Sequence, residues 1–187
     1  MARVHIAEMR GVVLHSPATI PDERGTFTKY FQRDMTTSGA SGSDLNSLSL
    51  ATNIEAGTLR GLHFQLSPYQ EEKVIICLSG AIFDVIVDLR QGSPTIGNWA
   101  SIELKSTEPA SLFLPKGFAH GYQTLTSDAS VFYCLGSEYR LEKARSLIFS
   151  DEDLNISWPL PVSQISKKDS QGIALKQALA EANLASL

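Results

Sequence analysis

The sequence predicts an all-β fold, an antiparallel barrel or jelly roll with a helix at its C-terminal end. Short runs rich in β-branched and aromatic residues fill the middle of the chain, and Gly, Pro and Ser separate them. Strands of this kind, with turn signals every ~8 to 12 residues, are typical of sandwiches and barrels. A helical pattern occurs mainly near the end of the chain, so the helices are expected to be few and peripheral.

Two segments in the middle of the chain carry clear strand patterns. The segment KVIICLSGAIFDVIVDLR (73–90) holds two apolar, β-branched runs on either side of Ser79-Gly80, which predicts a β-hairpin. The segment 100–106 alternates polar and apolar residues, as a half-buried strand does. The small and polar segment 36–47 is predicted to be a loop.

The C-terminal half adds further strands and the one clear helix. The segment 111–126 has the pattern of a strand, a Pro-Lys-Gly turn and a second strand, and 129–139 is again apolar and aromatic. Residues 172–187 combine helical spacing with strong helix formers, which predicts a helix capped by Ser170 or Asp169. Neither an internal repeat nor a linker interrupts the sequence, so a single domain over 1–187 is expected.

The composition argues against several classes of protein. With 187 residues, 43% hydrophobic and 19% charged, the chain has enough apolar material for one sizeable core. The net charge of -4 and the pI near 5.5 argue against nucleic-acid binding. The sequence contains no run of about 18 apolar residues that could span a membrane. The first residues lack the continuous apolar stretch of a secretory signal, which favours a cytoplasmic location.

Two of the four histidines stand in motifs that favour a functional site. His63 lies in TLRGLHFQ and His120 in PKGFAHGY, each shortly after a glycine and at the start of a strand-like run. Such positions are expected at the mouth of a β-barrel, where a ligand can reach them. Each histidine could equally be a structural residue that is satisfied by backbone hydrogen bonds.

The sequence does not favour a metal centre or a covalent nucleophile. A metal needs several His, Cys, Asp or Glu ligands at one point, and His63 has no second His or Glu in the residues that follow it closely. The chain has no GxSxG motif, no GxGxxG motif, and no Cys in a polar, basic setting. Neither a metal nor a cofactor is therefore expected.

Acid–base chemistry remains as the favoured interpretation. His63 is a plausible general base because its ordinary pKa lies near neutrality. Lys73 and Tyr133 lie in nearby strand-like runs and could act with it. A carboxylate could orient the histidine, as in hydrolytic triads. The candidates by residue type are Asp84, Asp88 and Asp169, and the sequence alone does not choose among them.

The stretch from Gly57 to Trp158 resembles the dTDP-4-dehydrorhamnose 3,5-epimerase family. Six motifs carry the resemblance in the right order and spacing: DERGTF (22–27), GTLRGLHFQ (57–65), EEKVIICLSGAIFDVIVDLRQGSPTIGNW (71–99), LFLPKGFAHGYQTL (112–125), VFYCLGSEY (131–139) and DEDLNISWP (151–159). One such motif would be weak evidence, but this many in register identify a member of the family. The resemblance implies a cupin-type jelly roll that works as a homodimer, without metal or cofactor, on a nucleotide-linked sugar.

The resemblance also implies roles for the catalytic residues. His63 matches the base that removes a proton from the sugar, and Asp169 resembles the carboxylate paired with that base. Tyr133 matches the acid that protonates the opposite face. Lys73 matches the group near the 4-keto oxygen, where a cation can stabilise an enolate.

Substrate binding is implied for six further residues. Arg60 and His120 match residues that hold the diphosphate. Arg24 and Phe27 resemble residues that reach the nucleotide, in the family from the partner subunit. Gln65 and Asp84 are expected to help shape the pocket.

The chain departs from the family's pattern at several positions around this set. Lys29 stands where the family usually has Glu. Leu48 and Leu50 stand where it usually has Gln and Asn, and Leu141 and Ala144 replace its usual Pro and Glu. All of these positions are expected on the substrate-binding periphery, so they leave open the nucleotide, the sugar and the number of inverted centres.

The sequence therefore predicts an isomerase that inverts C3 and C5 of dTDP-4-dehydro-6-deoxyglucose for dTDP-L-rhamnose synthesis. One alternative is a relative that inverts only C3 or only C5 of another nucleotide deoxysugar. A second alternative, of a different class, is a non-catalytic cupin that binds sugar nucleotides. The presence of His63, Lys73 and Tyr133 favours an enzyme over a binding protein.

Overall fold

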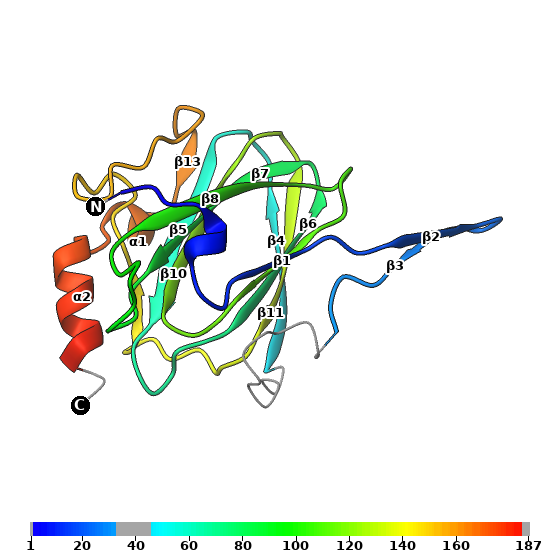
Figure 1. Cartoon of the computed structure of the whole chain (residues 1–187). Coiled ribbons are helices and arrows are strands. Elements are labelled where there is room, and N and C mark those ends of the chain that lie inside the picture. Colours follow the sequence, from blue (N-terminus) through cyan, green and yellow to red (C-terminus); the bar gives the residue numbers. More distant parts are fainter. Residues whose placement is uncertain (1, 33–45, 185–187) are drawn as a thin grey trace.

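The computed structural model describes residues 2–32 and 46–184, and its main body is built from two facing, mainly antiparallel sheets (Figure 1). One sheet has the order β1-β9-β6-β11-β4, and the other has the order β12-β5-β10-β7-β8, with β13 added beside β5. The strands of the first sheet are β1 (Val13–His15), β4 (Ser47–Asn53), β6 (Lys73–Ser79), β9 (Ser111–Leu114) and β11 (Ala129–Leu135). The second sheet contains β5 (Thr58–Gln65), β7 (Ala81–Asp88), β8 (Trp99–Lys105), β10 (Phe118–Thr124), β12 (Ala144–Ser146) and β13 (Gln164–Ile165). The predicted all-β jelly-roll fold is confirmed.

Short helices and a separate hairpin lie around this body. They are the 3₁₀-helix η1 (Ile6–Glu8), the helices α1 (Lys167–Ser170) and α2 (Leu175–Leu184), and the hairpin of β2 (Thr19–Asp22) and β3 (Gly25–Thr28). The hairpin extends away from the barrel as an exposed two-stranded arm, whereas α2 lies against the side of the second sheet (Figure 1). No helix among the described residues is long and apolar enough to cross a membrane.

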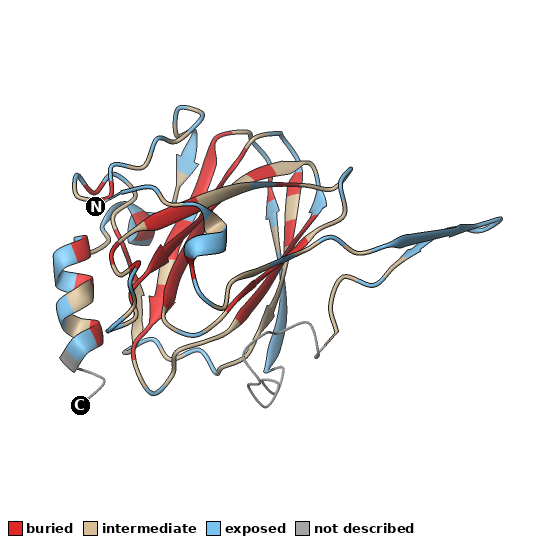
Figure 2. Ribbon diagram, viewed as in Figure 1, coloured by how far each residue is buried: buried red, intermediate tan, exposed pale blue. Residues whose placement is uncertain are grey.

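The core fills the space between the two sheets, where the buried strands are shown in red in Figure 2. Ile75 and Leu112 from the first sheet pack with Ile86, Leu104 and Tyr122 from the second, and all of them are almost fully buried. Burial of large aliphatic side chains on this scale is the main favourable contribution to folding. The core therefore fixes the spacing of the two sheets whose side chains line the site described below.

The hairpin predicted over 73–90 is wrong, although both of its strands exist. β6 pairs with β9 and β11, whereas β7 pairs with β8 and β10, so the two strands belong to different sheets. Only Gly80 lies between them, and one residue is too short for the common two-residue hairpin loop. With a positive φ of 71°, Gly80 lies where the chain crosses from one sheet to the other.

The helix predicted over 172–187 starts later than expected, and residues 185–187 lie outside the described residues. It begins at Leu175, and Asp169 and Ser170 are not its caps because they belong to the separate helix α1. The cap of α1 is Ser166, whose side chain accepts a hydrogen bond from the Asp169 backbone N–H. Of the predicted loop 36–47, residues 36–45 lie outside the described residues, and Ser47 already begins β4.

Candidate active site

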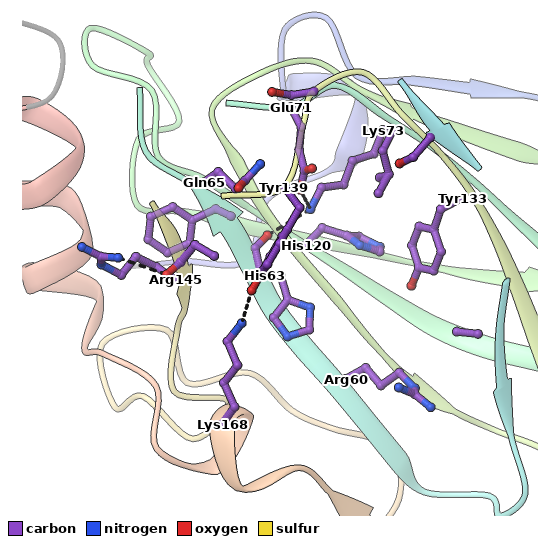
Figure 3. A pocket seen from close by; sticks show the side chains of 16 residues that line it. Arg60, His63, Gln65, Glu71, Lys73, His120, Tyr133, Tyr139, Arg145 and Lys168 are labelled. Atoms are coloured by element: carbon purple, nitrogen blue, oxygen red, sulfur yellow. Dashed lines mark hydrogen bonds and ion pairs between the residues drawn. The ribbon is translucent and has the colours of Figure 1, made fainter. Parts of the chain in front are cut away.

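Side chains from both sheets line a cavity of about 310 Å³ at one end of the barrel (Figure 3). His63 comes from β5 and His120 from β10, in the second sheet, whereas Lys73 and Tyr133 come from β6 and β11 in the facing sheet. Arg60, Gln65, Glu71, Tyr139, Arg145 and Lys168 also line this cavity. The structure thus brings together most of the residues singled out in the sequence.

The carboxylate beside His63 is Asp169, which settles the choice among the three aspartates. His63 Nε2 lies 2.6 Å from Asp169 Oδ1, and the Gly61 backbone N–H donates to Oδ2 over 3.3 Å. Asp169 is buried, and burial by itself raises the pKa of its carboxyl group. The hydrogen bonds from His63 and Gly61 outweigh burial, so the pKa is lowered and Asp169 is ionised at neutral pH.

Glycine is needed where Asp169 approaches β5. Gly61 has a positive φ of 119°, and a Cβ atom at this position would lie 2.5 Å from the Gly121 Cα on the neighbouring strand. A side chain at Gly61 would therefore separate β5 from β10, which carry His63 and His120. Close packing of β5 against β10 thus explains why the LRGLH motif has glycine at position 61.

The pair with Asp169 also sets the tautomer of His63. An ionised carboxylate accepts hydrogen bonds only, so His63 Nε2 must carry a proton and the neutral ring has a free lone pair on Nδ1. The His63 side chain is 42% exposed, so a ligand in the cavity can reach it. This arrangement is suited to accepting a proton.

Lys73 supplies a buried cation to the same cavity. Its ammonium group donates to the His63 backbone carbonyl over 3.2 Å and lies 2.9 Å from Glu71 Oε1. Both side chains are largely buried, so the ion pair holds Lys73 in one position. Glu71 is a site residue that was not predicted, although a carboxylate two residues before a lysine at the start of a strand was a usable signal.

His120 is not at the barrel mouth as predicted but is buried inside the barrel, with 3% of its side chain exposed. Its Nε2 lies 2.8 Å from Oδ2 of Asp84 on the adjacent strand β7. Asp84 is completely buried and does not line the cavity, so it can affect a ligand only through its neighbours. Burial raises the pKa of Asp84, and the charges of His120 and Lys73 oppose that rise.

Tyr133 presents a phenol to the cavity from the facing sheet. Its ring packs edge-on against His120, with 6.0 Å between the ring centroids and 75° between the planes. Burial raises the pKa of Tyr133 well above its ordinary value, and Tyr122 and Asp84 raise it further. The phenol is therefore protonated at neutral pH and available as a proton donor.

Arg60 and Gln65 are both held by hydrogen bonds within β5 and its surroundings. Arg60 Nε donates to Asn53 Oδ1 over 2.8 Å, and one of its terminal nitrogens donates to the Thr52 carbonyl over 3.2 Å. The Gln65 amide contacts the backbone of Tyr69, Glu138 and Arg140. Arg60 thus places a cation at the cavity wall, whereas Gln65 anchors the loops that surround the cavity.

Arg24 and Phe27 do not join the other predicted residues within this chain. Both lie on the hairpin of β2 and β3, which extends away from the barrel in Figure 1; both are exposed, and neither lines the cavity. Arg24 forms an ion pair of 2.6 Å with Asp22 of the same hairpin. Within a single chain, Arg24 and Phe27 therefore do not contribute to the cavity.

Leu48 and Leu50 were predicted on the substrate-binding periphery, and this is wrong for both. The cavity is lined by Ser47 and Ala51 of β4, whereas Leu48 and Leu50 point to the outer face and are 61% and 57% exposed. Successive side chains of a strand point to opposite faces, so a displacement of one residue reverses the assignment. Of the other departures, Ala144 lines the cavity, and Leu141 is 73% exposed.

Two residues that the sequence analysis did not single out meet at the mouth of the cavity. The Lys168 ammonium group donates to the Tyr139 hydroxyl over 3.2 Å, as Figure 3 shows. Lys168 precedes Asp169 in α1, so the contact connects the loop after β11 with the helix that carries Asp169. Within residues 2–32 and 46–184, no group of three or more His, Cys, Asp or Glu side chains could hold a metal ion.

The sequence is similar to that of a known family of proteins. The family profile described as dTDP-4-dehydrorhamnose 3,5-epimerase matches residues 7–177. A protein from Sinorhizobium fredii (strain NBRC 101917 / NGR234), named dTDP-4-dehydrorhamnose 3,5-epimerase, is 39% identical over 166 residues. That match covers 88% of this chain and 84% of the relative.

Solved structures with the same barrel include two sugar-nucleotide complexes. The dTDP-6-deoxy-D-glucose-3,5-epimerase of Legionella pneumophila, in complex with dTDP-4-keto-L-rhamnose, matches with a TM-score of 0.80 and 33% identity, over 94% of this chain and 92% of that one. A 3'-monoepimerase from Streptomyces bikiniensis, in complex with dTDP-quinovose, matches with a TM-score of 0.81 and 26% identity, over 98% and 100% of the two chains.

Proposed function

The chain belongs to the dTDP-4-dehydrorhamnose 3,5-epimerase family, and we propose from this that it inverts C3 and C5 of dTDP-4-dehydro-6-deoxyglucose in the synthesis of dTDP-L-rhamnose. The observation that carries the proposal is the His63–Asp169 pair in a cavity that also contains Lys73 and Tyr133. A base, a cation and a phenol are the three groups that this reaction needs.

The first step removes a proton from the carbon next to the ketone. His63 accepts it on Nδ1, and Asp169 stabilises the imidazolium that forms, because the carboxylate is already hydrogen-bonded to the ring. The electron pair of the broken C–H bond moves onto the ketone oxygen and gives an enolate. Lys73 lies beside the His63 backbone, where its positive charge would stabilise that oxygen.

The second step returns a proton from the other side of the sugar. Tyr133 comes from the sheet that faces His63, so a sugar ring between them would meet the base on one side and the phenol on the other. Transfer of the Tyr133 proton to the carbon inverts the centre. Arg60 and His120 are proposed to hold the diphosphate, Gln65 to shape the pocket wall through the loops it anchors, and Asp84 to act through His120.

We also propose a homodimer in which the hairpin arm of one chain supplies Arg24 and Phe27 to the cavity of the other. The arm extends away from the barrel and none of its residues lines the cavity of its own chain, and an isolated two-stranded hairpin is marginally stable in water. The edge strand β4 exposes Leu48 and Leu50 on its outer face, which gives a second chain an apolar surface to cover. The cytoplasmic location expected from the sequence stays a prediction.

Proton NMR of dTDP-4-dehydro-6-deoxyglucose with the protein in deuterated water tests the proposed function. Deuterium should enter both C3 and C5, and inverted sugar should accumulate. The similarity to a 3'-monoepimerase makes inversion at C3 alone the second candidate. Exchange at a single carbon would support that candidate, and binding without any exchange would support the non-catalytic alternative.

A further inference from the structure

Glu71 is the only carboxylate that lines the cavity in the part of the chain that the structure describes. It lies two residues before Lys73, where β6 begins, and 12% of its side chain is exposed. Burying a carboxylate is costly unless its charge is paired, and a carboxylate also repels the anionic diphosphate of the proposed substrate. Its presence in this cavity therefore calls for a specific role.

Lys73 pairs with this carboxylate but leaves acceptor positions on it. The Lys73 ammonium nitrogen lies 2.9 Å from Glu71 Oε1 (Figure 3). Within residues 2–32 and 46–184, no other hydrogen bond or ion pair reaches the Glu71 side chain. An ionised carboxylate has about four acceptor positions on its two oxygens. Glu71 can therefore accept a further hydrogen bond from a ligand in the cavity.

The same contacts leave one proton of Lys73 for a ligand. An ammonium group has three N–H donors. The His63 backbone carbonyl accepts one of them over 3.2 Å, and Glu71 accepts the second. The third is then available to the ketone oxygen in the proposed reaction. Lys73 and Glu71 thus present a donor and an acceptor side by side.

Positively charged side chains that suit a diphosphate lie on the other side of His63. In Figure 3, Glu71 and Lys73 lie on one side of the His63 ring, and Arg60 and Lys168 lie on the opposite side. A diphosphate is favoured beside Arg60 and Lys168 and disfavoured beside Glu71, because like charges repel. The sugar, rather than the diphosphate, is therefore the part of the substrate that meets Glu71.

The two carbons beside the ketone of dTDP-4-dehydro-6-deoxyglucose differ in what they offer a carboxylate. C3 carries a hydroxyl group, whereas C5 carries a methyl group and the ring oxygen, neither of which can donate a hydrogen bond. Oxygens on adjacent carbons of a sugar ring lie about as far apart as two hydrogen-bonded atoms. A ketone oxygen held by Lys73 therefore brings the C3 hydroxyl within reach of Glu71.

Resting on the proposed function, we propose that Glu71 is a specificity-determining residue, whose carboxylate accepts a hydrogen bond from the C3 hydroxyl of the sugar. No covalent bond changes in this contact. A hydrogen bond to a charged acceptor is roughly twice as strong as one between neutral groups. It places the C3 side of the ketone towards Glu71 and selects sugars that carry a hydroxyl at this carbon.

The competing interpretation is that Glu71 only holds Lys73 in position. In that case the loss of Glu71 should slow the reaction of every 4-keto sugar by the same factor. A substrate that lacks only the C3 hydroxyl separates the two roles. The probe is dTDP-4-dehydro-3,6-dideoxyglucose, which keeps the ketone and the C5 proton.

The experiment measures kcat/KM for deuterium exchange at C5 with both sugars in deuterated water. The preference of wild type for the sugar with the C3 hydroxyl should be roughly tenfold to a hundredfold greater than that of Glu71→Leu. Any intrinsic difference in reactivity between the two sugars cancels in this comparison. Glu71→Gln should show an intermediate preference, because its amide oxygen is a neutral acceptor, and it serves if Glu71→Leu does not fold.

Glu72→Leu is the matched control, because the neighbouring Glu72 side chain does not line the cavity. This variant should keep the wild-type preference. Equal losses with both sugars in Glu71→Leu, and hence an unchanged preference, would overturn the inference while leaving the proposed function intact. Failure of the wild-type chain to exchange deuterium with either sugar would instead reject the proposed function.

Discussion

His63 Nε2 lies 2.6 Å from Asp169 Oδ1, although 106 positions separate the two residues in the sequence. The contact joins β5 to the four-residue helix α1, whose N-cap is Ser166. Asp169 also accepts the Gly61 backbone N–H, so its carboxylate is fixed relative to the strand that carries His63. The base and its carboxylate are thus held by hydrogen bonds on both carboxylate oxygens.

The first prediction concerns the tautomer that this contact sets. In Asp169→Asn the amide oxygen should face the Gly61 N–H, which leaves the amide NH₂ group towards His63 Nε2. Nε2 must then accept, the proton moves to Nδ1, and the ring can no longer take a proton from the sugar. We expect deuterium exchange to fall by at least about a hundredfold.

The control for this change is Asp153→Asn, which alters an exposed carboxylate that pairs with Lys176. That variant should exchange deuterium at the wild-type rate. Normal exchange in Asp169→Asn, with the fold retained by circular dichroism, would mean that the base does not depend on this carboxylate. His63→Asn should abolish both exchange and inversion under the same conditions.

The second prediction separates the two faces of the sugar. Tyr133→Phe keeps the ring that packs against His120 and removes the hydroxyl. The proton should still be removed by His63, and the enolate should still be stabilised by Lys73, so exchange should continue. Inversion should fall by at least about a hundredfold, because reprotonation then occurs from the original face. Normal inversion would make Tyr139, which also lines the cavity, the next candidate for the acid.

The sequence predicted which residues line the site better than it predicted their partners. His63, Lys73 and Tyr133 stand in recognisable motifs, and all three line one cavity. Residue types alone left the carboxylate partner of His63 open, because contacts between distant segments depend on how the whole chain folds. The family resemblance pointed to Asp169, and the structure has Asp169 beside His63. The three candidate aspartates have different partners: Asp169 contacts His63, Asp84 contacts His120, and Asp88 contacts Arg90.

Errors in the fold prediction have a common cause in the geometry of strands. The apolar runs of β6 and β7 identified both strands, but a run that is buried on both faces does not reveal its pairing partner, so the hairpin was wrong. The predicted position of Leu48 and Leu50 at the substrate-binding periphery was wrong, because a shift of one residue along a strand moves a side chain to the other face of the sheet.

The third prediction concerns the ion pair of Lys73 with Glu71. Lys73→Met removes the cation near the ketone oxygen, and exchange should fall by about a hundredfold or more. The variant should also be less stable by roughly 3 kcal/mol, because Glu71 is left buried and unpaired. The double variant Glu71→Gln with Lys73→Met should regain stability, as measured by urea unfolding, because no buried charge is left unpaired. Its deuterium exchange should remain low. Recovery of exchange in the double variant would contradict the proposed role of Lys73.

The fourth prediction is a pH dependence of stability that comes from Asp88. Burial by itself raises the pKa of Asp88, but hydrogen bonds from Arg90, Ser93 and Thr95 outweigh it and hold the pKa below the ordinary value of 3.8. The folded state therefore binds fewer protons than the unfolded state in this range. The ionised Asp88 therefore contributes to the free energy of unfolding above pH 3.8. This contribution is lost as the pH falls through the pKa of Asp88 in the folded protein, which is lower.

Unfolding in urea between pH 7 and about pH 2 measures this contribution as the difference between wild type and Asp88→Asn. The comparison with the variant is needed because the pKa of Asp169 is also lowered, whereas that of Asp84 is raised. The variant should be less stable at pH 7, and its disadvantage should shrink at the acid end. A constant difference at every pH would show that Asp88 does not contribute through its charge.

The last prediction tests whether the hairpin arm serves the cavity of a second chain. Arg24→Ala should raise KM, because the proposed contact with the nucleotide is lost, and His63→Asn should abolish turnover. In a heterodimer of these two variants, the cavity with an intact His63 receives the intact arm of its partner. Random mixing should therefore restore roughly a quarter of wild-type activity at low substrate, since half of the dimers are mixed and one cavity in each is complete. A mixture of Arg24→Ala with the double variant Arg24→Ala/His63→Asn contains no intact arm and should show no recovery. Equal activity in the two mixtures would mean that Arg24 does not act across a dimer.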